Sequence, residues 1–369
     1  MMRNSALLPF SIIAAAVAGC SPSSQPAAPE THNATTATPP DARATPATPA
    51  AVTDTHIKPT PGALKTFGDW AVGCDNGLRC TLAALLPEDG FPSETGSPIT
   101  LNITREPGPA GAVSVKIATD NAPAQAAHPT GFAIDGRPTA LRDAASLTAA
   151  MANGTTLSVR GANGHALVTL SLKGAAAALR YIDAQQGRVG STDAIVAKGP
   201  APSRAPTPPL PAIATIAPSG AAAKLTAAQI ATLRKRATCT VEGFTPETHA
   251  LGGGKSLVIF PCSTGAYNLI SALFIVDGAG ITPAQFDAPA GFEATGADSG
   301  TPVKSVINGA FENGVLTSDA KGRGLGDCGV HQRFVWDGTR FRLSEQSEMR
   351  ECRGNADFIT TWRARVIRP

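Results

Sequence analysis

A glycine-rich segment near the C-terminus, Lys321–Gly329, is the main candidate for binding chemistry. Four glycines surround Lys321, Arg323 and Asp327, and Cys328 stands near its end. Glycine permits positive φ angles and close approach of a partner, so a basic loop pinned by a cysteine is suited to docking an anionic group. The alternative is a tight turn that needs glycine for its geometry, with Arg323 paired to Asp327.

A second basic feature follows this segment. From Lys321 to the C-terminus, basic residues outnumber acidic ones, and Arg340, Arg342, Arg363 and Arg365 stand at alternating positions. Alternation in a strand places each pair on one face, which could form a basic stripe toward peptidoglycan or lipopolysaccharide phosphates. The alternative is an ordinary solvated face.

Two segments come close to known catalytic or nucleotide-binding motifs without satisfying them. His249–Ser256 resembles a phosphate-binding P-loop, but histidine stands where the motif needs glycine, and 257–260 is typical of a strand where the motif needs a helix. Ala297–Pro302 resembles the nucleophile segment of trypsin-like proteases, but no upstream histidine has the required neighbours. We expect a hairpin loop and a polar turn, and no catalytic residues.

The cysteines predict disulfides rather than a metal site. The chain has seven, and setting Cys20 aside leaves an even number. No Cys-x-x-Cys pair occurs and the six histidines stand far apart, so neither a metal nor a cofactor is expected. The remaining cysteines fall two in the first half and four in the second, which favours the pairs Cys74 with Cys80, Cys239 with Cys262, and Cys328 with Cys352.

The first twenty residues predict export and lipidation. One positive charge precedes a short apolar run, which is the pattern of a signal peptide. Val17-Ala18-Gly19-Cys20 resembles the bacterial lipobox, which implies cleavage before Cys20 and lipid attachment to it. Ser21 stands where an inner-membrane retention signal has Asp, so the resemblance implies the outer membrane, facing the periplasm or the cell surface. An ordinary secretory peptide, cut elsewhere, is the alternative.

Composition divides the rest of the chain. Tracts rich in Ala and Pro, which bury little, predict a tether and a linker between two blocks that are each long enough to form a core. The formal net charge of +3 is too small to argue for nucleic acid. The expected divisions are 1–19 signal peptide, 20–63 lipidated disordered tether, 64–197 N-terminal α+β domain, 198–223 linker and 224–369 C-terminal β-rich domain.

Periodicity predicts an α+β fold: two mainly antiparallel β-sheet blocks with a few short helices, stapled by disulfides. Turn signals place hairpins at Asn76-Gly77 and Asp337-Gly338. The expected helices are 141–151, 175–184 and 226–236, the last capped by Thr226. The expected strands are 70–74, 99–105, 113–118, 155–160, 256–262, 268–276, 303–307, 315–317, 332–336, 340–343 and 361–366. Trp70, Trp336 and Trp362 are expected in the core.

Two stretches carry a resemblance to known families. Phe67–Asn76 and Lys321–Gly329, with Phe334–Gly338 and Glu351–Gly354, resemble a proteobacterial family of secreted proteins classed as a domain of unknown function. That resemblance covers nearly everything after the tether. The region from Asp69 to about Ala194 also resembles the invasion-associated locus B family of periplasmic or surface proteins, through the Trp-to-Cys strand and Leu170–Gly174. Neither resemblance implies catalytic residues.

These observations favour an envelope lipoprotein without enzymatic activity. We expect it to be held at a membrane by its lipid and to bind an envelope protein, peptidoglycan or lipopolysaccharide, in surface integrity or host interaction. One alternative is an inhibitor of an envelope-attacking enzyme such as lysozyme, for which a protruding rigid loop at Lys321–Gly329 would be suited. A second alternative is a hydrolase of cell-wall or ester bonds, which would need a pocket that gathers a nucleophile and a base.

Overall fold

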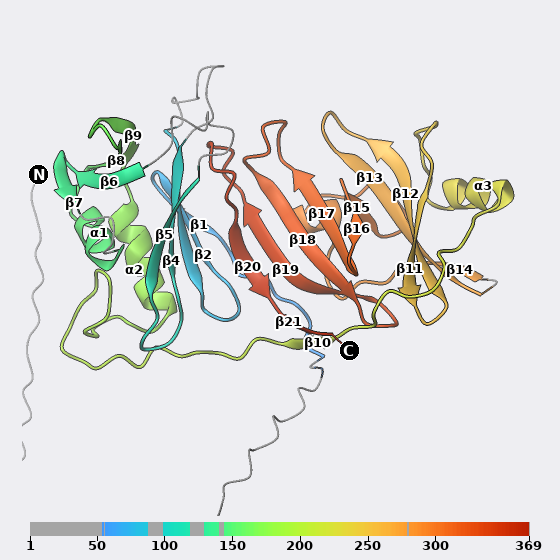
Figure 1. Cartoon of the computed structure of the whole chain (residues 1–369), viewed down its shortest axis with the longest axis horizontal. Coiled ribbons are helices and arrows are strands. Elements are labelled where there is room, and N and C mark those ends of the chain that lie inside the picture. Colours follow the sequence, from blue (N-terminus) through green and yellow to red (C-terminus); the bar gives the residue numbers. More distant parts are fainter. Residues whose placement is uncertain are drawn as a thin grey trace, which may run out of the picture. The chain divides into compact units, whose positions relative to one another are not determined.

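The chain folds mainly into antiparallel β-sheet in the computed structural model, which describes residues 54, 56–87, 99–118, 129–139, 144–278 and 280–368 (Figure 1). The expected signal peptide, Cys20 and most of the expected tether lie outside these residues. The described residues belong to one compact unit. The β-rich fold with a few short helices and with disulfides confirms the coarse expectation.

The expected hairpin at Asn76-Gly77 lies in the first sheet. Every neighbouring pair of strands in this sheet is antiparallel. Trp70 and Val72 alternate on the buried face of the strand before the turn. In spatial order the strands are β1 (Lys65–Phe67), β2 (Trp70–Cys74), β3 (Cys80–Ala84), β4 (Thr100–Arg105) and β5 (Val113–Ala118).

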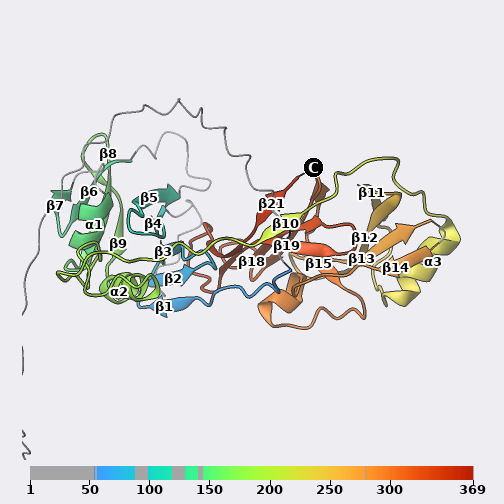
Figure 2. The ribbon, with the colours of Figure 1, turned by 90° about the horizontal axis from the view of Figure 1, so that it is seen from below.

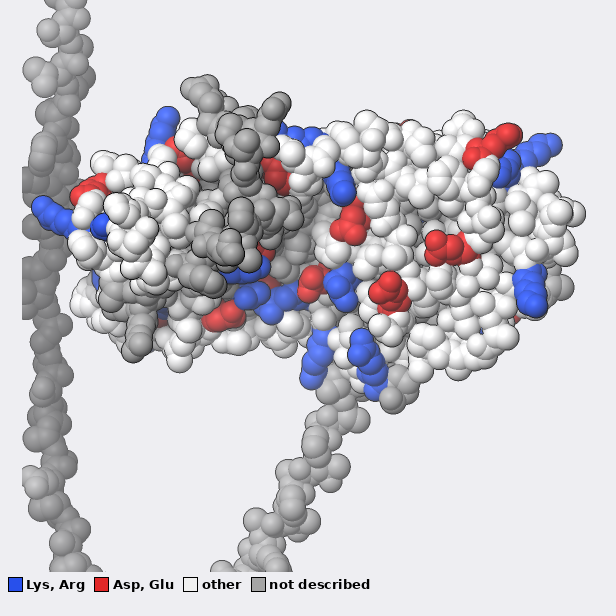
Figure 3. Space-filling view, turned by 45° about the horizontal axis from the view of Figure 1, so that its top comes forward, with Lys and Arg blue, Asp and Glu red and all other residues white. Residues whose placement is uncertain are grey.

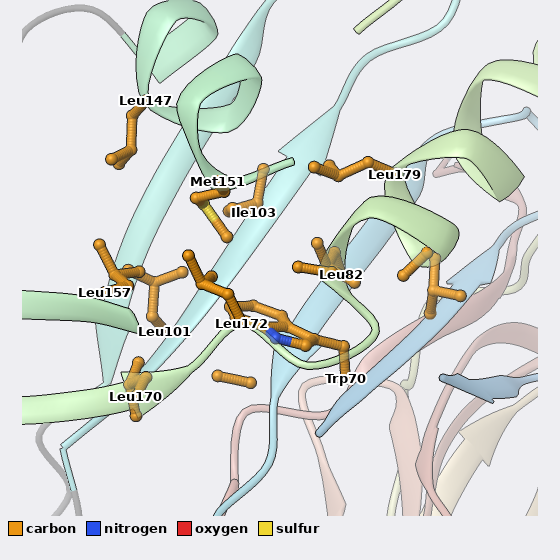
Figure 4. Packing of buried hydrophobic residues seen from close by; sticks show 14 of the residues in the cluster. Trp70, Leu82, Leu101, Ile103, Leu147, Met151, Leu157, Leu170, Leu172 and Leu179 are labelled. Atoms are coloured by element: carbon orange, nitrogen blue, oxygen red, sulfur yellow. The ribbon is translucent and has the colours of Figure 1, made fainter. Parts of the chain in front are cut away.

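A second sheet and two helices pack against the first sheet to form one core. Figure 4 shows Trp70 among the leucine, isoleucine and methionine side chains that these elements contribute. Its indole Nε1 donates a hydrogen bond to the Ser171 carbonyl oxygen at 2.9 Å. The elements are β7 (Arg137–Thr139), β6 (Pro129–Ile134), β8 (Thr156–Gly161) and β9 (Ala166–Ser171), with α1 (Ala144–Met151) and α2 (Ala175–Gln185).

Gly174 allows α2 to begin directly beside β1. Its φ is +90°, and a Cβ atom added there would lie 1.9 Å from the Phe67 carbonyl oxygen. A larger residue would therefore clash with backbone as well as strain its own. The end of the segment Leu170–Gly174 thus requires glycine for this close approach.

The expected linker is partly ordered into a strand. Within it, β10 (Ala212–Ala214) pairs in parallel with β21 (Arg365–Ile367), and Figure 2 shows the two side by side. The Arg365 N–H also donates to the Pro211 carbonyl oxygen at 2.7 Å. The Ala- and Pro-rich composition predicted a tract that buries little, yet Ala205, Ala212 and Ile213 are buried. The pairing of β10 with β21 depends on a contact far away in sequence.

Residues after 224 form two further sheets and a capped helix. We use first and second block below only for the residues before 198 and after 224, which belong to the same compact unit. Thr226 caps α3 (Ala227–Arg236) through a capping box with Gln229, as expected. One sheet has the order β11 (Glu247–Gly252), β12 (Lys255–Thr264), β13 (Leu269–Asp277) and β14 (Gly280–Pro283), and β15 (Ser305–Ile307) also pairs with β13. The other has the order β16 (Phe311–Glu312), β17 (Val315–Lys321), β18 (Gly329–Trp336), β19 (Phe341–Met349) and β20 (Ile359–Arg363).

The hairpin expected at Asp337-Gly338 joins β18 to β19. The Asp337 carboxylate accepts the backbone N–H groups of Thr339 and Arg340, each at 2.8 Å. Trp336 and Phe341 flank the turn, with ring centroids 5.1 Å apart. Trp362 is buried in the same core, as predicted.

Strand β19 continues well beyond the expected 340–343. The polar run Ser344–Glu348 does not look like buried strand in sequence, yet most of it is buried. Gln332 explains part of this, because its Nε2 donates to Gln346 Oε1 at 3.0 Å and to the Pro289 carbonyl oxygen at 2.9 Å. Its Oε1 accepts the Gly291 N–H at the start of the short helix η1 (Gly291–Thr295). Hydrogen bonds between distant segments thus satisfy polar groups that would otherwise be costly to bury.

Three disulfides follow the pairing favoured from the sequence. They join Cys74 to Cys80, Cys239 to Cys262, and Cys328 to Cys352. The third bond links the start of β18 to the loop between β19 and β20, Arg350–Phe358, which we call the docking loop.

The docking loop carries much of the contact between the two blocks. Asn355 is fully buried, and its Nδ2 donates to the Ala84 carbonyl oxygen at 2.8 Å and to Asn102 Oδ1 at 2.9 Å. Arg353 pairs with Asp69 at 2.5 Å and donates to the Leu86 carbonyl oxygen at 2.6 Å. The blocks are therefore joined by specific, largely buried polar contacts.

A second set of contacts lies at the hairpin of the first sheet. Arg363 pairs with the buried Asp75, and its backbone N–H donates to Asn76 Oδ1 at 2.8 Å. Asn76 Nδ2 returns a hydrogen bond to the Arg363 carbonyl oxygen at 2.9 Å. The Asn-Gly turn thus also binds the last strands of the second block.

Replacing Asn355 should weaken the fold through this interface. Asn355→Ala leaves the Ala84 carbonyl and the Asn102 amide without their buried donor, so we expect the free energy of unfolding to fall by about 1–3 kcal/mol. Chemical denaturation measures this change. Asn153→Ala, at an exposed helix end, is the control and should cost less than about 0.5 kcal/mol. Equal, small losses in both variants would contradict a structural role for the docking loop.

Candidate functional site

A cleft in the second block lies where several strands end. It has a volume of about 830 Å³, which falls in the range typical of small-ligand sites. Its wall is formed by the β12–β13 loop, by η1 with the residues after it, and by the ends of β17, β18 and β19. The lining ranges are 265–268, 292–297, 320–322, 328–330 and 348–350, together with Cys352.

The segment Lys321–Gly329 contributes both of its ends to this cleft. Lys321, Gly322, Cys328 and Gly329 line it, so the disulfide to Cys352 forms part of the wall. The segment could be recognised from the sequence, but the opposite walls could not. Those walls come from residues 19 or more positions outside the segment, and only the fold brings them together.

Inside the segment, Arg323 and Asp327 form a paired turn. Arg323 Nε donates to Asp327 Oδ1 at 2.6 Å, and Nη2 pairs with Oδ2. The Asp327 carboxylate also accepts the Gly354 N–H at 2.6 Å, and the Gly326 N–H donates to the Arg323 carbonyl oxygen at 3.0 Å. The geometry is that of the tight-turn alternative, because the Arg323 charge is already matched by Asp327. An anion docking at Arg323 would have to compete with this bond.

The tip of the turn presents an apolar side chain. Leu325 is 70 % exposed, although the turn around it is held by a disulfide and an ion pair. The Tyr267 ring lies against Gly324, where an added Cβ would be 3.7 Å from its Cδ1, and its hydroxyl donates to the Gly322 carbonyl oxygen at 2.8 Å. The loop is therefore preorganised, with leucine at its apex.

Glu348 is the buried carboxylate of the cleft. It lies opposite Val330 in the β18–β19 register and is 3 % exposed. Burial raises the pKa of its carboxyl, and the charge of Arg350, whose Nη2 lies 3.4 Å from Oε1, does not compensate fully. The polar sequence around Glu348 gave no sign of burial, so this residue was missed in the sequence analysis.

A second acid in the lining is already paired. Glu293 on η1 lies 2.5 Å from Lys304 Nζ, which is outside the lining. Among the described residues of the lining there is no histidine, and both cysteines are in the disulfide. The described lining therefore offers neither a histidine base nor a free thiol.

The possible basic stripe does not include two of the four arginines. Arg342 is buried and pairs with Asp287 at 2.7 Å, and Arg363 pairs with Asp75. Both charges are neutralised inside the structure because the alternating face is packed rather than solvated. On the face shown in Figure 3, acidic and basic side chains are interspersed and neither sign dominates.

The two near-motifs fold as expected for loops and turns. His249–Ser256 spans the turn between β11 and β12. Ser299 Oγ donates to the Thr301 carbonyl oxygen at 3.3 Å, and the Gly300 N–H donates to Asp298 Oδ1 at 3.0 Å, which is a polar turn. Of these two segments, only Ala297 lines the cleft.

One arrangement of catalytic residue types escaped the sequence analysis. Asp319, His331 and Ser347 are direct neighbours across β17, β18 and β19, and Asp319 Oδ1 contacts His331 Nδ1. The Ser347 hydroxyl instead pairs with the Thr360 hydroxyl at 3.2 Å. Among the described contacts it has no hydrogen bond to His331, and none of the three residues lines the cleft. The register that aligns them could not be read from the sequence.

The described part of the chain holds no group of three or more His, Cys, Asp or Glu residues placed to bind a metal ion. It also holds no helix with the length and apolar character needed to cross a membrane.

Comparison with known proteins places the chain beside proteins without an assigned function. The family model described as "Protein of unknown function (DUF1176)" matches residues 64–365. An Escherichia coli (strain K12) protein described as "Uncharacterized protein YpfG" is 28 % identical over 320 residues, which cover 76 % of this chain and 86 % of that protein. No solved structure matches. The expected resemblance to a family of unknown function is confirmed, whereas the resemblance to the invasion-associated locus B family stays a prediction.

Asp327 should make the stability of the protein depend on acidic pH. Burial would raise the pKa of Asp327, but hydrogen bonds from Arg323 and from the Gly354 N–H outweigh it and hold the pKa below its usual value. A depressed pKa stabilises the fold fully above the unfolded value of about 4, and this stabilisation is lost as pH falls through the folded pKa. Asp327→Asn should therefore cost about 2 kcal/mol at pH 7, and the difference from wild type should shrink below pH 4.

Denaturation across pH 2–7 measures this dependence, with Asp298→Asn, at an exposed turn, as the control. The control should keep the wild-type pH profile. If the profile of Asp327→Asn were parallel to that of wild type down to pH 2, the ion pair would not contribute to stability.

Proposed function

This chain belongs to the DUF1176 family of proteins of unknown function, and from that premise we propose that it is an exported, lipid-anchored binding protein of the cell envelope without catalytic activity. Its ligand is an envelope component, which is peptidoglycan, lipopolysaccharide or another envelope protein. Its role lies in surface integrity or host interaction. The site is the cleft beside the Cys328–Cys352 disulfide.

The observation that carries this proposal is the make-up of the cleft. A volume of about 830 Å³ is large enough for a small ligand or for one residue or sugar of a larger one. Its wall combines aromatic and aliphatic side chains with the charged residues Glu293, Lys321, Glu348 and Arg350, and the disulfide fixes one side. A preorganised surface that combines apolar side chains with charged groups of both signs is suited to recognising a ligand.

The proposed location is supported by two independent features. Val17-Ala18-Gly19-Cys20 has the sequence of a lipidation site, and Ser21 favours the outer membrane. The six other cysteines form three disulfides, which persist in an oxidising compartment such as the periplasm. The lipid on Cys20 is the proposed contact with the membrane.

Blocking the cleft should abolish partner capture. Ala297 is an exposed lining residue at the end of η1, so Ala297→Trp fills space without disturbing the core. Tagged full-length protein, purified in detergent, is incubated with envelope extract that contains solubilised proteins, lipopolysaccharide and digested peptidoglycan. We expect a component bound by wild type to fall at least about tenfold with Ala297→Trp.

Ala228→Trp is the matched control, because Ala228 is an equally exposed alanine on α3, outside the cleft. It should recover the same component as wild type. If both variants recover everything that wild type does, the cleft is not the binding site.

The preorganised turn around Leu325 favours a second candidate function, inhibition of an envelope-attacking enzyme such as lysozyme. An exposed leucine on a loop held by a disulfide is suited to insertion into an enzyme cleft, because little conformational entropy is lost on binding. Purified protein in excess should then slow lysis of cell walls by lysozyme. Leu325→Asp should remove this effect. A leucine such as Leu225, which packs against the core, would not serve as the matched control. Full lysis in the presence of wild type would exclude this candidate.

A further inference from the structure

Glu348 differs from the other buried carboxylates of this protein. Asp183 accepts three backbone N–H groups at 2.8–3.0 Å. Asp75 accepts the Gly77 N–H at 2.8 Å and the Arg79 N–H at 3.0 Å, and it pairs with Arg363. Asp327 has Arg323 and the Gly354 N–H, as described above. Each of these acids is surrounded by donors, as a buried charge requires.

Glu348 has a single, distant partner among the described residues. Arg350 Nη2 lies 3.4 Å from its Oε1, and the Arg350 side chain is 66 % exposed. Such a pair contributes little, because solvent screens the guanidinium and the exposed side chain loses conformational freedom in forming it. A carboxylate at 3 % exposure is therefore left with unfilled acceptor capacity at the wall of a cleft.

The surroundings of Glu348 restrict what could fill that capacity. Val330 lies opposite it and Phe292 lines the same cleft, so an incoming group meets Glu348 beside apolar side chains. The other charged residues of the lining are Glu293, Lys321 and Arg350. A metal ion would need several ligands, and the described residues place no group of three acids, histidines or cysteines together. A protonated amine needs one carboxylate, donates up to three hydrogen bonds, and gains from aromatic faces nearby.

We propose that the cleft binds a primary ammonium group on an alkyl arm, with Glu348 as its acceptor and Arg350 displaced into solvent. The alkyl arm lies along Phe292 and Val330. The ion pair of Glu348 with the solvent-screened Arg350 is replaced by an ion pair of Glu348 with the desolvated ammonium group. This inference rests on the proposed function and names the chemistry of its ligand. Two sources carry this group, a small diffusible amine and the amine of a diamino acid in a cell-wall peptide.

The displacement of Arg350 gives the inference its sharpest test. The probe is n-pentylamine, titrated into full-length protein by calorimetry, with n-pentanol as the uncharged analogue. Glu348→Gln keeps the shape of the side chain and should weaken pentylamine binding by about tenfold or more, since a hydrogen bond to a charged group is lost. Arg350→Ala removes the competing cation and should strengthen binding severalfold, the opposite of the result for an anion site.

Glu345→Gln is the control, because Glu345 lies on the same strand outside the cleft. It should bind like wild type. Equal affinity for pentylamine and pentanol, or an unchanged affinity in Glu348→Gln together with weaker binding in Arg350→Ala, would overturn the inference. The Arg350→Ala result stays decisive if Glu348→Gln does not fold, because Arg350 is exposed.

A further arm separates the two sources and the two proposals. The source is a peptide if a lysine tripeptide binds more tightly than pentylamine and its Nζ-acetylated form does not bind. Equal affinities of the tripeptide and pentylamine indicate a small amine. If no amine binds while Ala297→Trp still abolishes capture of an envelope component, this inference fails and the proposed function stands. If capture is also unaffected, both fail.

Discussion

The disulfide between Cys328 and Cys352 ties the candidate site to the contact between the two blocks. One of its ends stands where β18 begins, and the other stands in the docking loop that carries Arg353 and Asn355 onto the first sheet. Asp327, next to Cys328, accepts the Gly354 N–H and so fixes the same loop by a second bond. The shape of the cleft and the joining of the blocks therefore depend on one short, cross-linked region.

That region shows how the protein buries polar groups. Asn355, Arg353 and Asp327 all lie in places where water is largely excluded, and each has close partners from a distant part of the chain. Glu348, a few residues earlier, has one screened partner. A stable fold requires that buried polar groups have hydrogen-bond partners. Glu348 is an exception that lines a cleft, and it is more easily understood as a binding group than as a structural one. Burial costs the ionised Glu348 some stability, and a cationic ligand would return it.

Local signals determined which parts of this fold could be predicted. Local sequence patterns predicted three elements that depend on residues adjacent in sequence. These are the hairpin at Asp337-Gly338, the cap at Thr226 and the helix near Ala175. The buried polar end of β19 and the pairing of β10 with β21 could not be predicted, because both depend on hydrogen bonds across long separations. The same distinction applies to the site. Lys321–Gly329 was visible through its glycines, whereas Glu348 becomes significant only through burial.

The pairing of Arg323 with Asp327 changes the meaning of the glycine-rich loop. A free guanidinium there would attract anions, but the paired one instead holds the turn that positions Leu325 and one wall of the cleft. The positive charge of Arg323 thus serves geometry, and the buried charged group at the wall of the cleft is the acidic Glu348. A loop that looks basic in sequence therefore borders a site suited to a cation, because ion pairing within the fold decides which charges a ligand meets.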